Sequence, residues 1–490
     1  MTLAALVLLL AGATAASKAA ATRGLRTAVV ANSEFVPSND DLQFARIKGA
    51  GASAVRLDLN WTRVAPKHRP PNFDPRDPSS RAYDWDSADS RIRFAHAHGL
   101  DPIVLVSGAP SWAEGEIPRG TSHTERDGPY RPSPDQFGKF ARAAALRYDG
   151  SFRDDEGVKL PRVRYWIAWN EPNIYRYLTP QNLNGKPFSP EWYRRMVNAF
   201  SSRVHSVHSD NLVVAGATAP FGISRRISPL RFMRLMLCMS EGPRPHPTCS
   251  HTASFDIWSH HPYTRGNAFH TAVSPDDVSL GDLPEMHALV NAAAAAHHIV
   301  SKRRAVGLWV DEFGWDSRPP SRSRYTVPTA LHARWTAEAL YQMWRSGVSL
   351  ATWFLLRDEP VGASLNQTGL WFIGSPPDNM HRDRPKPSLY AFRFPFVAYR
   401  DAARVSIWGR TPTSTGGSIA IEARMRSGWR RVGRLHAGGN GVFVGKLRFG
   451  PIEQGASRPD AAMLRAQYRD LTSRAFSLEQ PRDRFVLPFA

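Results

Sequence analysis

The strongest constraint on the fold is an alternation of short apolar runs with longer amphipathic stretches, which continues from about residue 25 to residue 400. Eight of the short runs have the length and composition of buried strands: Thr27–Ala31, Ala54–Leu59, Pro102–Ser107, Val163–Trp169, Leu212–Ala217, Phe255–Ser259, Gly307–Val310 and Leu350–Leu355. Strands that recur with helices between them pair in parallel, and eight repeats close into a barrel. We therefore predict an α/β fold, a (β/α)8 TIM barrel over residues 25–398.

The helical segments between these strands carry start and stop signals. They are Ser38–Gly49, Ala88–His98, Pro134–Tyr148, Ser189–His205, Leu283–Val300 and Ala330–Ser346. Acidic residues open the first helix, while His98-Gly99 and Ser346-Gly347 are typical of glycine-terminated ends. An open doubly wound sheet is the alternative, but no glycine-rich dinucleotide loop follows the first strand.

The composition changes after Phe396, and residues 400–490 predict a small antiparallel β-sandwich. Short alternating runs separated by glycine-rich turns replace the helical periodicity: Val405–Trp408, Ser418–Ala423, Arg430–Leu435, Val442–Leu447 and Met463–Gln467. This segment has 16 Arg and Lys against 7 Asp and Glu, a net charge of +9. It could adhere to an anionic or carbohydrate surface, or it could pack against the barrel and seal one side. We favour packing, because appended domains often serve stability.

Residues 1–21 resemble a signal peptide. An apolar run ends near Leu10 and is followed by small residues that include Ala13-Thr14-Ala15, the form of a cleavage site. The run is too short for a stable membrane anchor, and no later stretch predicts a membrane span. We expect a secreted, extracellular protein.

The sequence contains only two cysteines, Cys238 and Cys249, on either side of a proline-rich loop. They could form one local disulfide in an oxidising compartment, or remain two unconnected thiols. Neither a CxxC nor an HExxH arrangement is present, so no zinc or other metal site is expected.

The formal net charge of +20 does not by itself indicate a nucleic-acid partner. Basic residues occur throughout the chain without a nucleic-acid fold signature, and we expect no nucleic-acid binding. An anionic cell-wall surface or an acidic polysaccharide is the alternative partner for this charge. We expect a monomer whose main partner is a carbohydrate substrate.

Two glutamates stand where predicted strands end. In Tyr165–Asn173 an apolar strand runs into Asn170-Glu171-Pro172, and in Leu308–Trp315 a second strand delivers Glu312 before a glycine turn. Side chains at the carboxyl ends of barrel strands project into the active site. The apolar surroundings of Glu171 favour a protonated carboxyl group that can donate its proton.

The two glutamates occupy the predicted strands four and seven, whose ends can converge across a barrel mouth. A separation of about 5 Å would make one a nucleophile and the other an acid/base, with net retention of the anomeric configuration. The alternative for each is a structural salt bridge at the rim.

These two segments resemble glycoside hydrolase clan A, most closely its families 5 and 39, over residues 27–395. The resemblance implies that Glu171 is the acid/base and Glu312 the nucleophile. It also implies that Asn170 contacts the sugar 2-hydroxyl. The fold it implies is the barrel predicted above.

Other segments match the clan more loosely. Arg56, in the predicted second strand, would support Glu312 and keep it ionised, although an ordinary rim ion pair is the alternative. His261 and Tyr263, after strand six, would hydrogen-bond near the nucleophile unless they only pack a turn. Three tryptophans are candidate sugar platforms, with core packing as the alternative outside strand eight: Trp353, Trp112 and Trp315.

The sequence thus predicts a retaining O-glycoside hydrolase acting on a β-linked oligo- or polysaccharide by double displacement, without a cofactor. A transglycosidase with the same residues is one alternative. A non-catalytic barrel that binds carbohydrate or cell wall is another.

Overall fold

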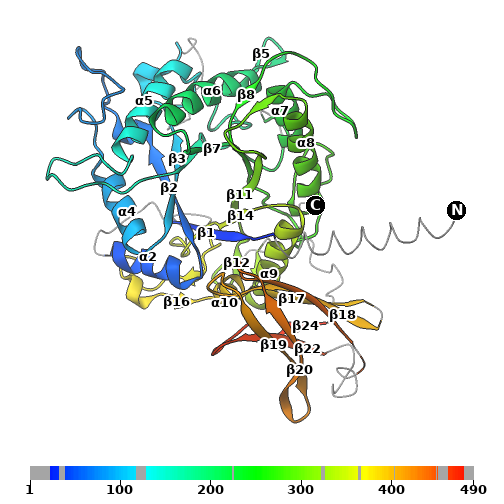
Figure 1. Cartoon of the computed structure of the whole chain (residues 1–490). Helices are drawn as coiled ribbons and strands as arrows, with labels where there is room; N and C mark the ends of the chain where they lie inside the picture. Colours follow the sequence, from blue (N-terminus) through cyan, green and yellow to red (C-terminus); the bar gives the residue numbers. More distant parts are fainter. Residues whose placement is uncertain are drawn as a thin grey trace.

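A closed barrel of eight parallel strands forms the centre of the molecule (Figure 1). The structure is a computed structural model that describes residues 23–31, 39–116, 128–222, 226–321, 326–361, 366–401, 403–448, 450 and 462–478. Around the barrel the strands are β1 (Arg26–Val30), β2 (Ala54–Asn60), β3 (Asp101–Ser107), β4 (Tyr165–Ala168), β7 (Leu212–Thr218), β9 (Ile257–His260), β11 (Gly307–Phe313) and β14 (Leu350–Trp353). Each predicted strand is present, and the TIM barrel is confirmed.

The side chains of each barrel strand point alternately inward and outward, so the apolar ones form two separate cores. One core fills the barrel and includes Ile103, Ile167 and Trp309. The other lies between the strands and the surrounding helices, and it includes Val55 and Val310. Successive side chains of a strand point to opposite faces, so every second residue faces the barrel interior and the residues between them face the helices.

Helices cover the outside of the barrel, as the sequence predicts. They are α2 (Asp40–Gly49), α3 (Trp61–Val64), α4 (Asp86–Ala97), α5 (Pro134–Arg147), α6 (Ser189–Val207), α7 (Pro229–Leu237), α8 (Leu283–Ala295), α9 (Thr329–Arg345) and α10 (Pro387–Arg393). The expected helix Leu283–Val300 is too long. His297 adopts a φ of 61°, and Ile299–Val300 then pairs as the short strand β10 with β8 (Ala253–Ser254).

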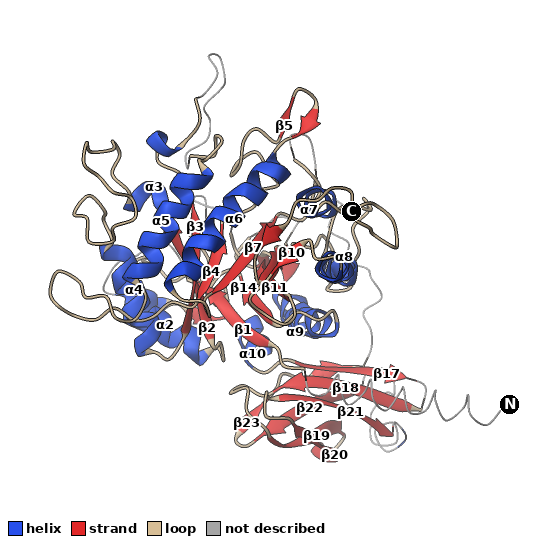
Figure 2. Cartoon of the chain, turned by 45° about the horizontal axis from the view of Figure 1, so that its top comes forward, coloured by secondary structure: helices blue, strands red, loops and turns tan. Residues whose placement is uncertain are grey.

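Two antiparallel sheets follow the barrel and lie on one side of it (Figure 2). The first contains β17 (Phe396–Asp401), β18 (Arg404–Arg410) and β21 (Val442–Arg448). The second contains β19 (Gly417–Met425), β20 (Gly428–Ala437), β22 (Met463–Tyr468), β23 (Leu471–Thr472) and β24 (Phe476–Ser477). We call the two sheets together the sandwich.

Aromatic side chains join the sandwich to the barrel. The rings of Trp408 and Tyr399 contact Tyr341 of α9 with centroid distances of 5.6 and 5.8 Å, and Trp408 also lies 5.8 Å from Trp344. Arg334 of α9 donates to the carbonyl of Ser477 at 3.0 Å. The sandwich therefore packs closely against α9.

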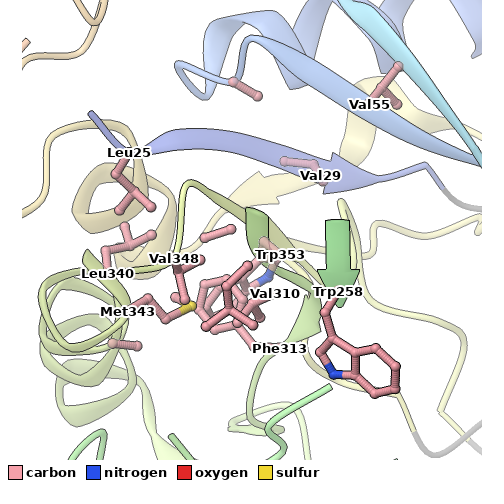
Figure 3. Close-up of a cluster of buried hydrophobic side chains, with 14 of the residues drawn as sticks. Leu25, Val29, Val55, Trp258, Val310, Phe313, Leu340, Met343, Val348 and Trp353 are labelled. Atoms are coloured by element: carbon pink, nitrogen blue, oxygen red, sulfur yellow. The ribbon is translucent and has the colours of Figure 1, made fainter. Parts of the chain in front are cut away.

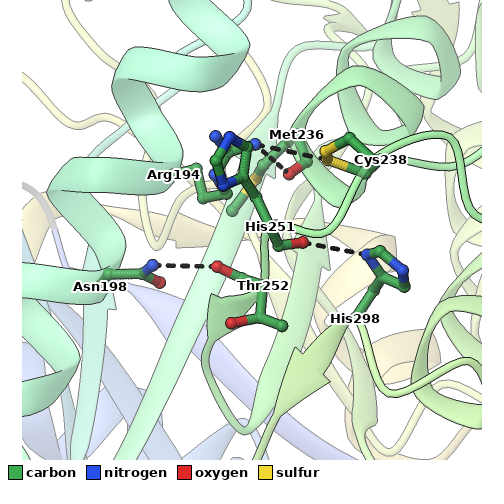
Figure 4. Close-up of a disulfide and its surroundings, with 8 residues drawn as sticks. Arg194, Asn198, Met236, Cys238, His251, Thr252 and His298 are labelled. Carbon is green, nitrogen blue, oxygen red and sulfur yellow. Dashed lines mark hydrogen bonds between the residues drawn. A yellow bond between two sulfur atoms is a disulfide. The ribbon is translucent and has the colours of Figure 1, made fainter.

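A disulfide joins Cys238, at the end of α7, to Cys249 (Figure 4). Met239 and Pro247 form a bridge inside the closed loop. Arg194 of α6 contacts the Cys238 sulfur at 3.7 Å. No helix in the described ranges is both long enough and apolar enough to cross a membrane. The signal-like segment 1–21 lies outside the described residues.

Candidate active site

Glu171 reaches the barrel mouth through an unusual backbone turn after β4. Trp169 and Glu171 adopt φ angles of 77° and 38°, in the left-handed region that non-glycine residues rarely occupy. The turn is held by the Glu171 N–H, which donates to the carbonyl of Ala217 at 2.9 Å, and by the Trp169 indole, which donates to the carbonyl of Tyr177 at 2.7 Å. Such backbone geometry gathers at functional sites, where the surrounding structure maintains it.

Glu312 lies in β11, where the pairing with β14 is interrupted. The register shifts between Val310 and Phe313, and this irregularity lets two consecutive acids, Asp311 and Glu312, approach the same site. Both side chains are buried, with exposed fractions of 1% and 10%.

Two donors hold the Glu312 carboxylate, one on each oxygen. Arg56 Nη1 lies 2.5 Å from Oε1, and the Tyr263 hydroxyl donates to Oε2 at 2.7 Å. Burial opposes the charge of Arg56, but the nearby Glu312, Asp58 and Asp311 outweigh it and raise the pKa of the guanidinium. Burial and the charge of Glu312 raise the pKa of Tyr263, so its hydroxyl remains a donor. This arrangement fixes the orientation of the Glu312 carboxylate.

His261 lies between the acids of the site. Its Nδ1 is 3.1 Å from Glu171 Oε1 and 3.6 Å from Glu312 Oε2, while Nε2 is 3.2 Å from Asp311 Oδ2. Burial opposes protonation of the ring, but the charges of Glu312 and Asp311 outweigh it and raise the pKa of His261 to about 10. The ring is therefore protonated at neutral pH and donates to Glu171.

The neighbouring His260 shows that this behaviour comes from position. His260 points out of the barrel, where its ring contacts Thr218 Oγ1 at 2.8 Å and the Val278 carbonyl at 3.0 Å. Burial lowers its pKa to about 3, so it stays neutral. Two adjacent histidines thus carry different charges because strand alternation places only one of them among carboxylates.

The contacts of His261 also limit the distance between the two glutamates. Glu171 Oε1 and Glu312 Oε2 both lie close to Nδ1, so they are separated by no more than the sum of the two distances, about 6.7 Å. The structure therefore brings together the two acids that the sequence singled out, with Arg56, His261 and Tyr263 around them.

A cavity of 290 Å³ opens onto these groups. Its lining includes Asn170, whose buried Oδ1 accepts no hydrogen bond from the described residues. A buried polar oxygen without a protein partner, at a cavity wall, is placed to receive a ligand hydroxyl.

Sequence reasoning missed several residues that line this cavity: Asp58, Asn60, Ser107, Tyr177, Phe354 and Glu359. Strand alternation could have found the first two, because Asp58 and Asn60 follow Arg56 at intervals of two along β2. Tyr177 and Glu359 come from loops, where no periodicity marks them.

The expected sugar platform Trp353 needs correction. Its side chain is fully buried on the outer face of β14, where it contacts Phe313 (Figure 3). Its ring also lies 6.1 Å from that of Phe392. Its indole donates to the carbonyl of Thr368 at 2.9 Å. The next residue, Phe354, lines the cavity instead. The expectation was wrong by one residue, and one residue reverses the direction of a strand side chain.

The other two tryptophans also lie outside the lining of this cavity. Trp112 packs edge-on against Trp61 and donates to the carbonyl of Pro66 at 2.9 Å. Trp315 is 4% exposed and packs on Trp335, with its indole directed at the carbonyls of Thr264 and Gly266. Both rings therefore serve packing.

Within the described ranges, no group of three or more His, Cys, Asp or Glu side chains is arranged to hold a metal ion. The acids of the site contact arginine, histidine and tyrosine.

Comparison with known proteins finds similarity only among solved structures. No family model matches the chain, and no curated protein matches it. A family 39 glycoside hydrolase from Bacteroides cellulosilyticus has a TM-score of 0.49 and 17% identity, over 88% of this chain and 80% of that one. A GH39 enzyme from Xanthomonas axonopodis has a TM-score of 0.47 and 14% identity, over 88% and 93% of the two chains. A monomeric beta-xylosidase from Caulobacter crescentus has a TM-score of 0.45 and 14% identity, over 82% of each.

Proposed function

We propose that the protein is a retaining O-glycoside hydrolase that cleaves a β-linked oligo- or polysaccharide. The observation that carries the proposal is the unequal environment of two neighbouring acids. Glu312 is held on both oxygens by Arg56 and Tyr263, whereas Glu171 accepts a hydrogen bond from His261 and borders the cavity. Carboxyl groups placed in such different surroundings can take the roles of nucleophile and proton donor.

Glu312 would attack the anomeric carbon. The contacts of Arg56 and Tyr263 fix the orientation of its carboxylate. The new bond joins Glu312 to the sugar as the bond to the leaving oxygen breaks, and that oxygen takes a proton from Glu171. Glu171 would carry this proton on Oε2, while its Oε1 accepts the hydrogen bond from His261 Nδ1 at 3.1 Å.

In the second step a water molecule would replace the leaving group. Glu171 removes its proton as the oxygen attacks the anomeric carbon, and Glu312 leaves as a carboxylate. The upper limit of about 6.7 Å between Glu171 Oε1 and Glu312 Oε2 supports retention, because it lies below nearly all of the range of about 6.5–9.5 Å at which inverting enzymes hold their carboxyl groups to admit a water. The buried Asn170 Oδ1, which accepts no hydrogen bond from the described residues, would accept one from the sugar 2-hydroxyl.

The charge of the cavity favours a neutral glycoside over a uronide. Among the described residues that line it, Asp58, Glu171, Glu312 and Glu359 are acidic and Arg56 is the one cation. Arg56 already contacts Glu312 and Asp58. A substrate carboxylate would therefore lie close to several acidic side chains. We expect kcat/KM for an aryl β-glucuronide to be at least about tenfold below that of the best neutral aryl β-glycoside.

Glu312→Ala and Glu171→Ala test the assignment against a panel of aryl β-glycosides. Loss of Glu312 should lower kcat by a factor on the order of 10⁴ or more. Loss of Glu171 should harm substrates with poor leaving groups most, and azide should restore turnover of activated ones. If the Glu312 variant hydrolyses as fast as the wild type, the proposal fails. Glycosyl transfer to an added acceptor sugar as the dominant product would indicate a transglycosidase, and binding without turnover would indicate a non-catalytic barrel.

We also infer that the protein is exported. The disulfide between Cys238 and Cys249 suits an oxidising compartment, and this supports the interpretation of residues 1–21 as a leader. Expression in a secreting host followed by N-terminal sequencing tests it: a mature chain starting shortly after Ala15 is expected, and retention of the whole segment in the cytosol would contradict it.

A further inference from the structure

The second sheet of the sandwich carries cationic side chains on its outer face. Pairing between β19 and β20 sets Arg431 opposite Glu422 and Arg434 opposite Ala420, and pairing between β19 and β22 sets Arg465 opposite Glu422. Paired residues share one face of a sheet. The alternate positions Ile421, Ala423 and Ala466 are buried between the sheets, so the arginines point to solvent. We call Arg424, Arg431, Arg434 and Arg465 the arginine face.

This face has little negative charge to neutralise it. Glu422 is the one acid on the paired positions of β19, β20 and β22, and it accepts a hydrogen bond from Arg465 Nε at 2.7 Å. Arg424, Arg431 and Arg434 are exposed and have no carboxylate partner within the described residues. Unpaired guanidinium groups bind carboxylates and sulfates in a bidentate manner.

A tryptophan helps to organise the arginine face. The guanidinium of Arg465 lies 4.3 Å from the centre of the Trp429 ring, and that of Arg424 lies 5.9 Å from it. Stacking on the indole restricts these long side chains and reduces the conformational entropy that they lose when a ligand binds.

The arginine face is accessible. The sandwich packs on the barrel through Tyr399, Trp408 and Phe476, while β19 and β20 lie on its far side (Figure 2). Adjacent strands are about 4.8 Å apart and same-face residues along a strand about 7 Å apart. The charges therefore form a flat array over several strands, which suits an extended polymer.

We propose that the arginine face binds an acidic polysaccharide, a polymer with carboxylate or sulfate groups, and holds the enzyme on it. The choice of a polysaccharide among polyanions rests on the proposed function of the barrel, because a glycosidase meets its substrate within a mixture of glycans. The bound polymer would differ from the one cleaved, since the cavity is itself acidic.

Binding of the full chain to polygalacturonate, measured by biolayer interferometry, tests this proposal. A neutral dextran and double-stranded DNA are the comparison polymers. We expect binding to polygalacturonate that weakens as salt is added, and at least tenfold weaker binding by the triple variant R424Q/R431Q/R434Q. The matched control R203Q/R244Q/R304Q removes the same charge from exposed positions on the barrel and should retain binding within about twofold.

Equal weakening by the two triple variants would overturn the proposal, because binding would then depend on net charge alone. Equal or tighter binding to DNA would also overturn it, in favour of a nucleic-acid surface, as would equal binding to dextran. The assay involves no turnover, and the triple variant should hydrolyse a small aryl glycoside at the wild-type rate. Failure of the proposed hydrolysis and failure of this binding are therefore separate results.

Discussion

The barrel mouth and the arginine face handle charge in opposite ways. At the mouth, Arg56, His261, Asp311 and Glu312 are buried and Glu171 is half-buried, and these side chains form contacts of 2.5 to 3.6 Å. On the arginine face, Arg424, Arg431 and Arg434 are exposed to solvent and have no acid beside them in the described structure. Buried pairs interact strongly and fix geometry, whereas exposed charges each contribute little and act by number. One region is suited to chemistry and the other to adhesion.

The largest difference in stability should come from one lysine in each region. Lys386 is fully buried near the mouth and donates to Asp358 at 2.6 Å, Ser317 at 2.8 Å and the Gln367 carbonyl at 2.9 Å. Lys386→Met leaves Asp358 unpaired and should cost about 3–5 kcal/mol of unfolding free energy. Lys446→Met breaks an exposed pair with Asp401 and should cost less than about 1 kcal/mol. Urea denaturation measures both unfolding free energies. Equal losses in the two variants would contradict the expected difference between a buried and an exposed ion pair.

The same substitution in the two regions should have very different effects on catalysis. Arg56→Gln removes the cation 2.5 Å from Glu312, and kcat/KM should fall about 100- to 1000-fold, or about 3–4 kcal/mol. Arg434→Gln should change it by less than about twofold, because an exposed charge far from the mouth is screened. Steady-state kinetics on an aryl glycoside measures kcat/KM of both variants. An Arg56 variant with more than a tenth of wild-type activity would show that Glu312 does not need its partner.

The pH dependence separates the two regions further. The pKa of His261 is raised from 6.5 to about 10, so its stabilising contribution is complete below pH 6.5 and is lost as pH rises through about 10. Activity and unfolding free energy should therefore both decline toward pH 10, and His261→Asn should flatten that decline in stability. His436→Asn, at an exposed position of β20, should leave both profiles unchanged. If the unfolding free energy of the His261 variant still declines toward pH 10, a group other than His261 causes the decline.

Salt should have the smallest effect at the mouth. Between about 50 and 500 mM NaCl, hydrolysis of a small neutral glycoside should change by less than about twofold, because buried pairs are poorly screened. Polygalacturonate binding should fall steeply over the same range, as expected when counterions are displaced. Parallel loss of hydrolysis and binding would show that the mouth also depends on exposed charge.

Much of this contrast could be predicted from the sequence. The apolar runs located all eight barrel strands, and their ends placed Glu171 and Glu312 at one mouth. The five runs after residue 400 correspond to β18 to β22, and the net charge of that segment already pointed to an anionic surface. The strands, the positions of the two glutamates and the charge of this segment could be predicted because they depend only on local sequence pattern and on composition.

The rest depends on tertiary geometry. Trp353 and Phe354 differ by one position, and only the packing of β14 shows which of them faces the cavity. The interrupted register of β11, which brings Asp311 beside His261, has no sequence mark. An alanine-rich run extended the expected helix to Val300, although the backbone turns at His297. Periodicity cannot locate strand ends, bulges or loops to within one residue.

Trapping of a covalent intermediate tests the central claim most directly. The wild-type protein would be treated with the 2-deoxy-2-fluoro analogue of its best aryl β-glycoside, and the product analysed by intact mass and peptide mapping. The claim predicts one fluorosugar attached to Glu312, with inactivation at the same rate as labelling, and no label on the Glu312→Gln protein. A label on Glu171, or hydrolysis of the parent glycoside with inversion and no covalent adduct, would contradict it.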